Sequence, residues 1–400
     1  MRDSQLVMEA VASRADELHE LGKFLWDNPE TAFKEEKAHE YLTDLLEKQG
    51  FRVQRNYCLP TAFRAEYGDG RPVVALLCEY DALPGLGHAC GHNLIAMSSV
   101  GAGIAVKAAL EVDASLRGKV VIMGTPAEEG GMGKELMLQK GAFDDVDVAL
   151  MSHPEHRDAL RLMMTARSLI KAVFHGKSAH ASLAPWEGLS ALDAAVGAYV
   201  NISMLRQRMK PTWRVHGVML NAGTQSNIIP DESELCYSVR APTTTEMLTV
   251  KEQVEACFRA AALAAGCTAT ISEKSPTAKH MIQNEVLIRL YQKHAERLGI
   301  TFEDSEPGQF VATGVTSDIG NISHRLPCIH PVFGIVTAGK NHSSEFNEAT
   351  GTLQSREKAL TIATVLALTV LDVLRETAVL DDIRAEFRAT LSKPLQNGDV

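Results

Sequence analysis

The chain has 400 residues, which is more than one ordinary hydrophobic core accommodates, so we expect two domains. Apolar residues make up 45% and charged residues 22%, as is typical of globular proteins in water. The formal net charge of −10 and the lack of a long basic run argue against a nucleic acid or an anionic membrane surface as a partner.

The first 165 residues alternate between helix-like and strand-like segments. Helical periodicity covers residues 5–27, 34–49 and 93–110. Three apolar, β-rich runs predict strands buried on both faces, at residues 73–80, 119–125 and 146–152. This alternation predicts a mostly parallel sheet with helices on both faces, in which ligands bind at the carboxyl ends of the strands.

The pattern changes after about residue 165. Strand-like segments at 166–175, 213–221 and 233–240 bracket two long helices at about 188–209 and 244–265. From about residue 281 the earlier pattern resumes, and it ends in a helix near 353–376. We therefore predict an α/β fold with a discontinuous domain of residues 1–165 and 281–400, interrupted by a smaller α+β domain of residues 166–280.

Residue types that bind metals gather in the loop after the first predicted strand. Cys90 and His92 are separated by one glycine in the segment GHACGHNL, and His88 lies just before them. Thiolate and imidazole are ligands that zinc prefers, and glycine lets the backbone turn tightly around an ion. Two ligands do not complete a site, so the remaining ligands and a base must come from other segments.

Further candidate ligands follow the other predicted strands. Glu128 and Glu129 follow the second strand; such a pair is more often a solvated surface feature, but the buried-type strand and the Gly-Gly that flank it argue against that. His153 follows the third strand and His342 precedes the final helix, and either histidine alone is commonly structural. One α/β domain thus carries five candidate ligand residues, enough for two metals that share a bridge: Cys90, His92, Glu129, His153 and His342.

Four motifs, in order, resemble the dimetal aminoacylase/carboxypeptidase-type metallopeptidases, and more narrowly their cysteine-ligand amidohydrolase branch. The matching segments are DALP with GHACGHNL, PAEEGG, SHPE and NHSSE, and the match covers roughly residues 10–378. This branch includes β-alanyl-lysine dipeptidases, p-aminobenzoyl-glutamate hydrolase and indole-acetyl-amino-acid hydrolases. The resemblance implies a catalytic, dimetal-binding domain of residues 1–165 and 281–400 and a lid and dimerisation domain of residues 166–280.

Carried over residue by residue, the resemblance implies that Cys90 bridges two metal ions as a thiolate. His92 and His153 would complete one metal site, and Glu129 and His342 the other.

The same resemblance implies roles for two acidic residues and shows one departure at a third position. Glu128 would be the general base, and Asp81 would orient a ligand imidazole from outside the coordination shell. Where the wider family has a ligand histidine two residues before this aspartate, the chain has Glu79, a departure that the cysteine branch shares.

The predicted lid carries three more positions that match the family. His180 in GKSAHAS would stabilise the oxyanion, a role that it could fill across a dimer, and Asn227 in SNIIPD would lie near the substrate. Arg240 in SVRAP would hold the substrate carboxylate, because a guanidinium binds a carboxylate through two hydrogen bonds. Without the resemblance, Asn227 equally suits the cap of a turn and Arg240 an ion pair.

The implied reaction is hydrolysis of an amide or peptide bond in a dipeptide or N-acyl amino acid by a metal-activated water. One alternative makes Cys90 a nucleophile with His88 or His92 as its base, but it leaves the glutamate pair and the other histidines unexplained. Another alternative is a metal-dependent binder without catalysis, which has no use for Glu128.

The sequence specifies the substrate and the metal less closely than it specifies the candidate ligand residues. Asp318 in TSDIGN is a candidate for a pocket wall that favours a basic or amino-bearing substrate, or for a cap of Gly320. Thiolate and imidazole favour zinc, whereas carboxylate ligands also admit manganese or cobalt. The expected partners are a small substrate and a second copy of the chain.

Three features predict a cytoplasmic location. The opening segment lacks an apolar leader pattern, and the apolar run near 361–374 is too short to span a bilayer. The seven cysteines are odd in number and scattered, which is typical of reduced thiols.

Overall fold

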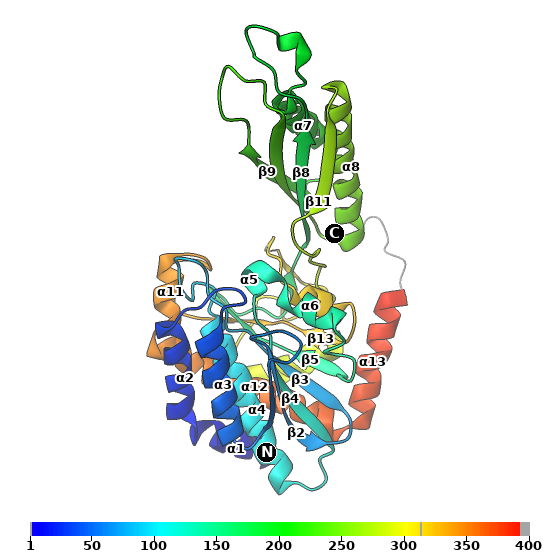
Figure 1. Cartoon of the computed structure of the whole chain (residues 1–400). Helices are drawn as coiled ribbons and strands as arrows, with labels where there is room; N and C mark the ends of the chain where they lie inside the picture. The colour runs from blue at the N-terminus through cyan, green and yellow to red at the C-terminus, as the bar shows by residue number, and fades with distance from the viewer. Residues whose placement is uncertain (1, 313, 393–400) are drawn as a thin grey trace. The chain divides into compact units, whose positions relative to one another are not determined.

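The computed structural model describes residues 2–312 and 314–392, which form two compact units (Figure 1). Unit 1 lies within Met1–Met163, Met281–Thr313 and Ser317–Val400, and unit 2 comprises Met164–His280 and Gly314–Thr316. The sequence pattern does not predict that Gly314–Thr316 belongs with unit 2. The roles of unit 2 as a lid and in dimerisation stay predictions.

Unit 1 is built on a six-stranded sheet with the strand order β1-β2-β4-β3-β5-β13. These strands are β1 (Arg52–Arg55), β2 (Phe63–Asp69), β3 (Val73–Cys78), β4 (Gly118–Gly124), β5 (Val148–Leu150) and β13 (Cys328–Ile329). β4, β3, β5 and β13 pair in parallel, whereas β1 and β2 form an antiparallel edge. Every residue of β3 is buried, as expected for an apolar strand flanked by helices. The predicted α/β fold with a mostly parallel sheet is confirmed.

Helices flank this sheet (Figure 1). The longer ones are α1 (Arg2–Ala12), α2 (Ala15–Asp27), α3 (Glu36–Lys48), α4 (His92–Val112), α9 (Glu285–Arg297), α12 (Leu353–Arg375) and α13 (Thr377–Ser392). The shorter ones are α5 (Glu128–Gly131), α6 (Gly133–Gln139), α10 (Ile319–Ser323) and α11 (Ser344–Thr350). Two pairs of short parallel strands complete the unit: β6 (His153–Glu155) with β14 (Val332–Gly334), and β7 (Leu162–Met163) with β12 (Val311–Ala312).

Helix α4 lies at the centre of the unit 1 core, where it packs against α1, α2, α12 and the strands β3 and β4. Among the described helices it alone is long and apolar enough to cross a membrane by length and composition. In the structure, however, 72% of its apolar window is buried, and its side chains such as Leu94 and Val106 belong to the core. We therefore interpret α4 as a core helix.

Unit 2 is a four-stranded antiparallel sheet covered by two helices, with the strand order β11-β8-β10-β9. Its elements are β8 (Ala166–His175), α7 (Ala191–Leu205), β9 (Arg214–Asn221), β10 (Glu232–Ala241), α8 (Thr244–Ala264) and β11 (Thr268–Glu273), with 3-10 turns at Pro185–Glu187 and Arg206–Arg208. Buried and half-buried residues alternate along β8. One face of the sheet therefore packs on α7 and α8, and the other carries the more exposed side chains.

The first helix and the edge strand β1 are among the features of unit 1 that differ from the sequence prediction. The helix expected over residues 5–27 is two helices, because the chain turns at Ser13 and Arg14, where the Ser13 hydroxyl donates to the carbonyl of Ala10 at 2.9 Å. The edge strand β1 lacks a predictive pattern, because its charged residues are exposed or half-buried rather than part of an apolar run.

Candidate metal centre

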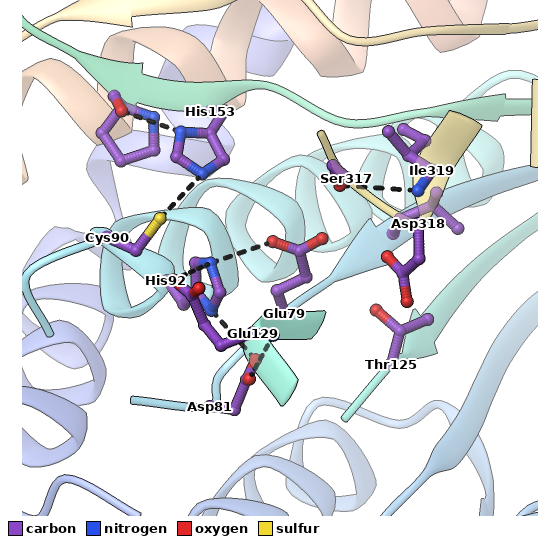
Figure 2. A network of polar contacts seen from close by, with 12 residues as sticks. Glu79, Asp81, Cys90, His92, Thr125, Glu129, His153, Ser317, Asp318 and Ile319 are labelled. Carbon is purple, nitrogen blue, oxygen red and sulfur yellow. Dashed lines mark hydrogen bonds and ion pairs between the residues drawn. The ribbon is translucent and has the colours of Figure 1, made fainter. Parts of the chain in front are cut away.

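Neighbouring parallel strands bring the predicted ligands together in unit 1. Cys90 and His92 follow β3, Glu128 and Glu129 follow β4, and His153 follows β5. Because these strands are adjacent in the order β4-β3-β5, the segments after them meet at one edge of the sheet. The side chains of Cys90, His92, Glu129 and His153 gather there (Figure 2). The sequence predicts that all five ligands lie in loops, but this is wrong for three of them: His92 begins α4, Glu129 lies in α5 with Glu128, and His153 begins β6.

Two groups of ligand atoms share the sulfur of Cys90. Cys90, His92 and His153 form the first group, in which Cys90 Sγ lies 3.5 Å from His153 Nε2. Cys90, Glu129 and His342 form the second, in which His342 Nε2 lies 3.2 Å from Glu129 Oε1. Within each group the ligand atoms lie within 4.8 Å of one another. This is the grouping that the resemblance implies, and its sulfur, nitrogen and oxygen donors suit divalent first-row metal ions.

Two of the three candidate ligand imidazoles, those of His92 and His153, are held through Nδ1, so that Nε2 faces the other candidate ligands. Asp81 Oδ1 lies 2.9 Å from His92 Nδ1, and the carbonyl oxygen of Pro154 lies 2.8 Å from His153 Nδ1. Nε2 of His92 is buried and makes no hydrogen bond. A metal-binding histidine usually donates its other ring N–H in this way, so these residues fit a metal centre.

Unusual backbone conformations shape the segments that carry the ligands. Gly91 has φ 81°, and a Cβ there would lie 2.3 Å from Pro154 Cγ, so the turn into α4 requires glycine. Ala127 and His342 adopt left-handed conformations without being glycine, with φ of 60° and 69°. Such strain persists only where the surrounding structure imposes it, which is common at functional sites.

The electrostatic environment of the centre favours a bound cation. Burial, together with the carboxylate of Glu129, raises the pKa of the Cys90 thiol well above its ordinary value. A thiolate at this position therefore needs positive charge beside it, which a divalent metal ion supplies. Burial and the carboxylates of Glu79 and Glu129 also raise the pKa of Glu128, in the direction that favours uptake of a proton.

A buried lysine lies in the same part of unit 1, and sequence reasoning misses it. Lys134 is fully buried, and its Nζ lies 2.5 Å from both Glu79 Oε1 and Asp318 Oδ1. Asp318 Oδ2 accepts a second hydrogen bond, from the backbone amide of Lys134 at 2.9 Å. A lysine beside a glutamate in a short helical pattern normally indicates an exposed face, so no local signal identifies it.

This cluster corrects the interpretation of Asp318. Its side chain is fully buried and both carboxylate oxygens are bound by Lys134, which leaves no surface for a basic substrate. The capping alternative is also wrong, because the amide of Gly320 donates to the carbonyl of Ser317 at 3.1 Å. Asp318 and Glu79 instead neutralise the buried lysine, so Asp318 is not assigned to substrate binding.

The other predicted substrate residues lie in unit 2. The segments that carry His180 and Asn227 are joined by a hydrogen bond from the Ala181 amide to the Asn227 carbonyl at 2.9 Å. His180 Nδ1 accepts from the amides of Ser182 and Leu183, both at 3.3 Å, so its Nε2 remains for other contacts. The roles of His180 and Asn227 in catalysis stay predictions.

Arg240 forms no ion pair within the part of the chain that the structure describes. Its guanidinium donates to Thr316 Oγ1 at 2.9 Å and to the carbonyl of Gly314 at 3.2 Å. Across the sheet it lies opposite Arg167 of β8 and Arg214 of β9, so three arginines form a row. Burial and the charge of Arg167 lower the pKa of Arg240. An arginine in this setting is suited to bind an anion rather than to serve a structural ion pair.

Known proteins share both the sequence and the fold. Residues 75–367 match the sequence model of Peptidase family M20/M25/M40. The Xaa-Arg dipeptidase of Mus musculus is 43% identical, over 97% of this chain and 94% of that protein. One of the p-aminobenzoyl-glutamate hydrolase subunits of Escherichia coli (strain K12) is 38% identical, over 65% of this chain and 58% of that protein.

A solved structure shows the same fold. The Bacillus subtilis YXEP protein, a dinuclear metal binding peptidase from the M20 family, aligns with a TM-score of 0.69 at 21% identity. The alignment covers 91% of this chain and 99% of that one.

Proposed function

Because the chain belongs to Peptidase family M20/M25/M40, it is a metal-dependent peptidase, and we propose that its substrates are dipeptides with a basic C-terminal residue. The observation that carries the proposed chemistry is the pair of ligand groups that share Cys90. The proposed substrate class is supported by similarity to an Xaa-Arg dipeptidase over 97% of this chain.

The proposed centre holds two divalent metal ions. Cys90 would bridge them, with His92 and His153 on one ion and Glu129 and His342 on the other, as the two ligand groups suggest. Thiolate and imidazole ligands favour zinc, and the carboxylate also admits manganese or cobalt. Metal analysis of the purified protein tests both the number and the identity of the ions.

The proposed catalytic residues each have a separate role in hydrolysis. When bound, the metal ions would polarise the scissile carbonyl and lower the pKa of water from 15.7 toward roughly 7. Glu128 accepts the proton of the attacking water and passes it to the leaving amine nitrogen. Asp81 keeps the imidazole of His92 in place through its 2.9 Å contact. His180 donates a hydrogen bond to the oxyanion of the tetrahedral intermediate.

Arg240 is proposed to bind the carboxylate of the substrate. Replacing it by alanine is expected to raise the KM for a dipeptide by about tenfold or more, because a hydrogen bond to a charged group contributes roughly 1.5–3 kcal/mol. The kcat should change much less, since the contact lies away from the reacting bond. Initial rates with a β-alanyl dipeptide and an Xaa-Arg dipeptide measure both constants.

The matched control is Lys171→Ala. Lys171 belongs to β8 of the same sheet but has its own carboxylate partner, Glu234, at 2.8 Å, so its loss should leave KM unchanged. An Arg240→Ala enzyme with the KM of the wild type would contradict the assignment.

A second candidate substrate is p-aminobenzoyl-glutamate, which the 38% identity to the Escherichia coli hydrolase supports. A hydrolysis panel should therefore include it together with N-acyl amino acids. A higher kcat/KM for p-aminobenzoyl-glutamate than for every basic dipeptide would favour this second candidate.

We also propose that unit 2 pairs with unit 2 of a second copy of the chain. Helix α7 exposes a stripe of apolar side chains at helical spacing: Val196, Tyr199, Val200 and Met204. The edge strand β9 also exposes Val218 and Leu220. Exposed apolar surface of this kind, beside an unpaired sheet edge, favours association with an identical surface.

The double substitution Tyr199→Glu, Met204→Glu is expected to convert a dimer into a monomer, because it places two charges in the stripe on α7. Sedimentation velocity measures the change. The control is Leu263→Glu, since Leu263 is 82% exposed on α8 and should tolerate a charge without changing the mass. A monomeric wild type, or a dimeric double variant, would contradict the proposal.

A further inference from the structure

We propose that Glu35 is a positioning residue that holds the turn carrying Glu128 and Glu129. Glu35 lies before α3, far from this turn in sequence, and its side chain is fully buried. It contacts none of the proposed metal ligands, so it would act through the backbone. The inference rests on the proposed function, in which these two glutamates are the general base and a metal ligand.

The carboxylate of Glu35 connects three separate segments of unit 1. Its Oε1 accepts hydrogen bonds from the backbone amides of Phe33 and Ala127, both at 3.0 Å. Its Oε2 accepts from the hydroxyl of Thr61 at 2.7 Å. The side chain makes no capping hydrogen bond to α3, so its contacts do not serve the helix that follows it.

The two amides bound by Oε1 belong to residues with strained backbones. Phe33 and Ala127 both have φ of 60°, a conformation that L-residues other than glycine rarely adopt. Ala127 directly precedes Glu128 and is the residue before α5. The hydrogen bond from the Ala127 amide to Glu35 stabilises the left-handed conformation from which α5 begins.

The turn after Ala127 fits its surroundings closely. The amide of Gly131 donates to the carbonyl of Ala127 at 2.9 Å, and a Cβ on Gly131 would lie 2.3 Å from the ring of Phe33. On the other side, the amide of Glu129 donates to Asp81 Oδ2 at 3.0 Å. Two buried carboxylates thus hold the turn, and only Asp81 also touches a ligand imidazole.

Two variants separate the hydrogen bonds of Glu35 from its charge. Glu35→Gln keeps an acceptor oxygen for both amides, and burial raises the pKa of Glu35 to about 7, so a neutral side chain is a fair mimic. Glu35→Ala removes the acceptor. We expect Glu35→Ala to lower kcat and metal affinity by about tenfold each, and Glu35→Gln to stay within about threefold of wild type.

A suppressor tests the physical reason. Glycine adopts the left-handed conformation without strain, so adding Ala127→Gly to Glu35→Ala should recover most of the lost metal affinity and kcat. A general packing defect at Glu35 would not respond to a change at Ala127. The surface control is Glu36→Ala, because Glu36 is exposed in the first turn of α3.

The readouts are kcat for the substrates of the wild type, zinc titration of the metal-free protein, and thermal melting. Wild-type values for Glu35→Ala, or losses that neither Glu35→Gln nor Ala127→Gly relieves, would overturn the inference. If Glu35→Ala does not fold, Thr61→Val replaces it, because this change removes only the hydroxyl that orients the carboxylate. A fall of about threefold or more in the metal affinity of Thr61→Val supports the inference, and an unchanged metal affinity overturns it. The zinc titration needs no substrate, so it tests the inference independently of the proposed function. A wild-type protein that binds zinc but hydrolyses none of the proposed substrates would contradict the proposed function alone.

Discussion

Replacing Glu128 by glutamine is expected to lower kcat by about 10²–10⁴-fold while the protein keeps its metal ions. Glutamine has nearly the same shape as glutamate but cannot take a proton from water. The Cys90-centred ligand groups do not include Glu128, so the substitution should not empty either metal position. The measurements are steady-state hydrolysis and metal analysis of the same preparation.

The adjacent residue provides the matched comparison. Glu129 belongs to the group with Cys90 and His342, so Glu129→Gln should lose metal as well as activity. Glu128 also lies in a third potential ligand group, with His92 and Glu129, and loss of metal from Glu128→Gln would make it a ligand instead of a base. Near-normal turnover by Glu128→Gln would show that another group takes the proton.

Replacing Cys90 by alanine is expected to remove metal from both positions, because its sulfur is the one ligand atom that the two Cys90-centred groups have in common. Metal content should fall from two ions to less than one per chain, and hydrolysis should fall by about 10³-fold or more, since metal activation of water is lost. Dialysis against metal-free buffer followed by metal analysis and activity assays measures this outcome.

The control is Cys236→Ala, a change of a buried cysteine in β10 of unit 2 that should leave the metal content at two ions.

The same experiment tests the alternative in which Cys90 is a nucleophile. In that case Cys90→Ala would keep its metal, and the wild type would be inactivated by alkylation even with metal bound. The metal-bridging assignment predicts protection of Cys90 from alkylation by bound metal.

Part of the proposed centre can be predicted from short spacing in the sequence, and the rest from the resemblance of four motifs to a known family. Cys90 and His92 flank one glycine, and the conformation of Gly91 shows why no other residue fits there. The resemblance implies that Asp81 orients a ligand imidazole, and Asp81 Oδ1 lies 2.9 Å from His92 Nδ1. Only the pairing of Cys90 with His92 around one glycine follows from neighbouring residues alone.

Contacts between residues that lie far apart along the chain cannot be predicted in this way. Lys134 looks like a surface residue in sequence, yet Glu79 and Asp318, which lie far from it along the chain, neutralise it in the interior. The sequence interpretation of Asp318 failed for this reason, because a carboxylate that would suit a basic substrate was already bound to a lysine. Whether a charged side chain is available to a ligand depends on what it contacts, and contacts are a property of the folded chain.

The sequence by itself determined the types of ligand, their order along the chain, the alternation of strands and helices, and the family to which the protein belongs. Only the tertiary structure decided that Lys134 lies buried between Glu79 and Asp318, and that Glu35 supports the strained residue before Glu128. The physical reason is that the chemistry of each side chain and the local periodicity can be recognised from the sequence without knowledge of the fold. Which group each buried carboxylate contacts, in contrast, depends on which distant segments the sheet brings within hydrogen-bonding distance.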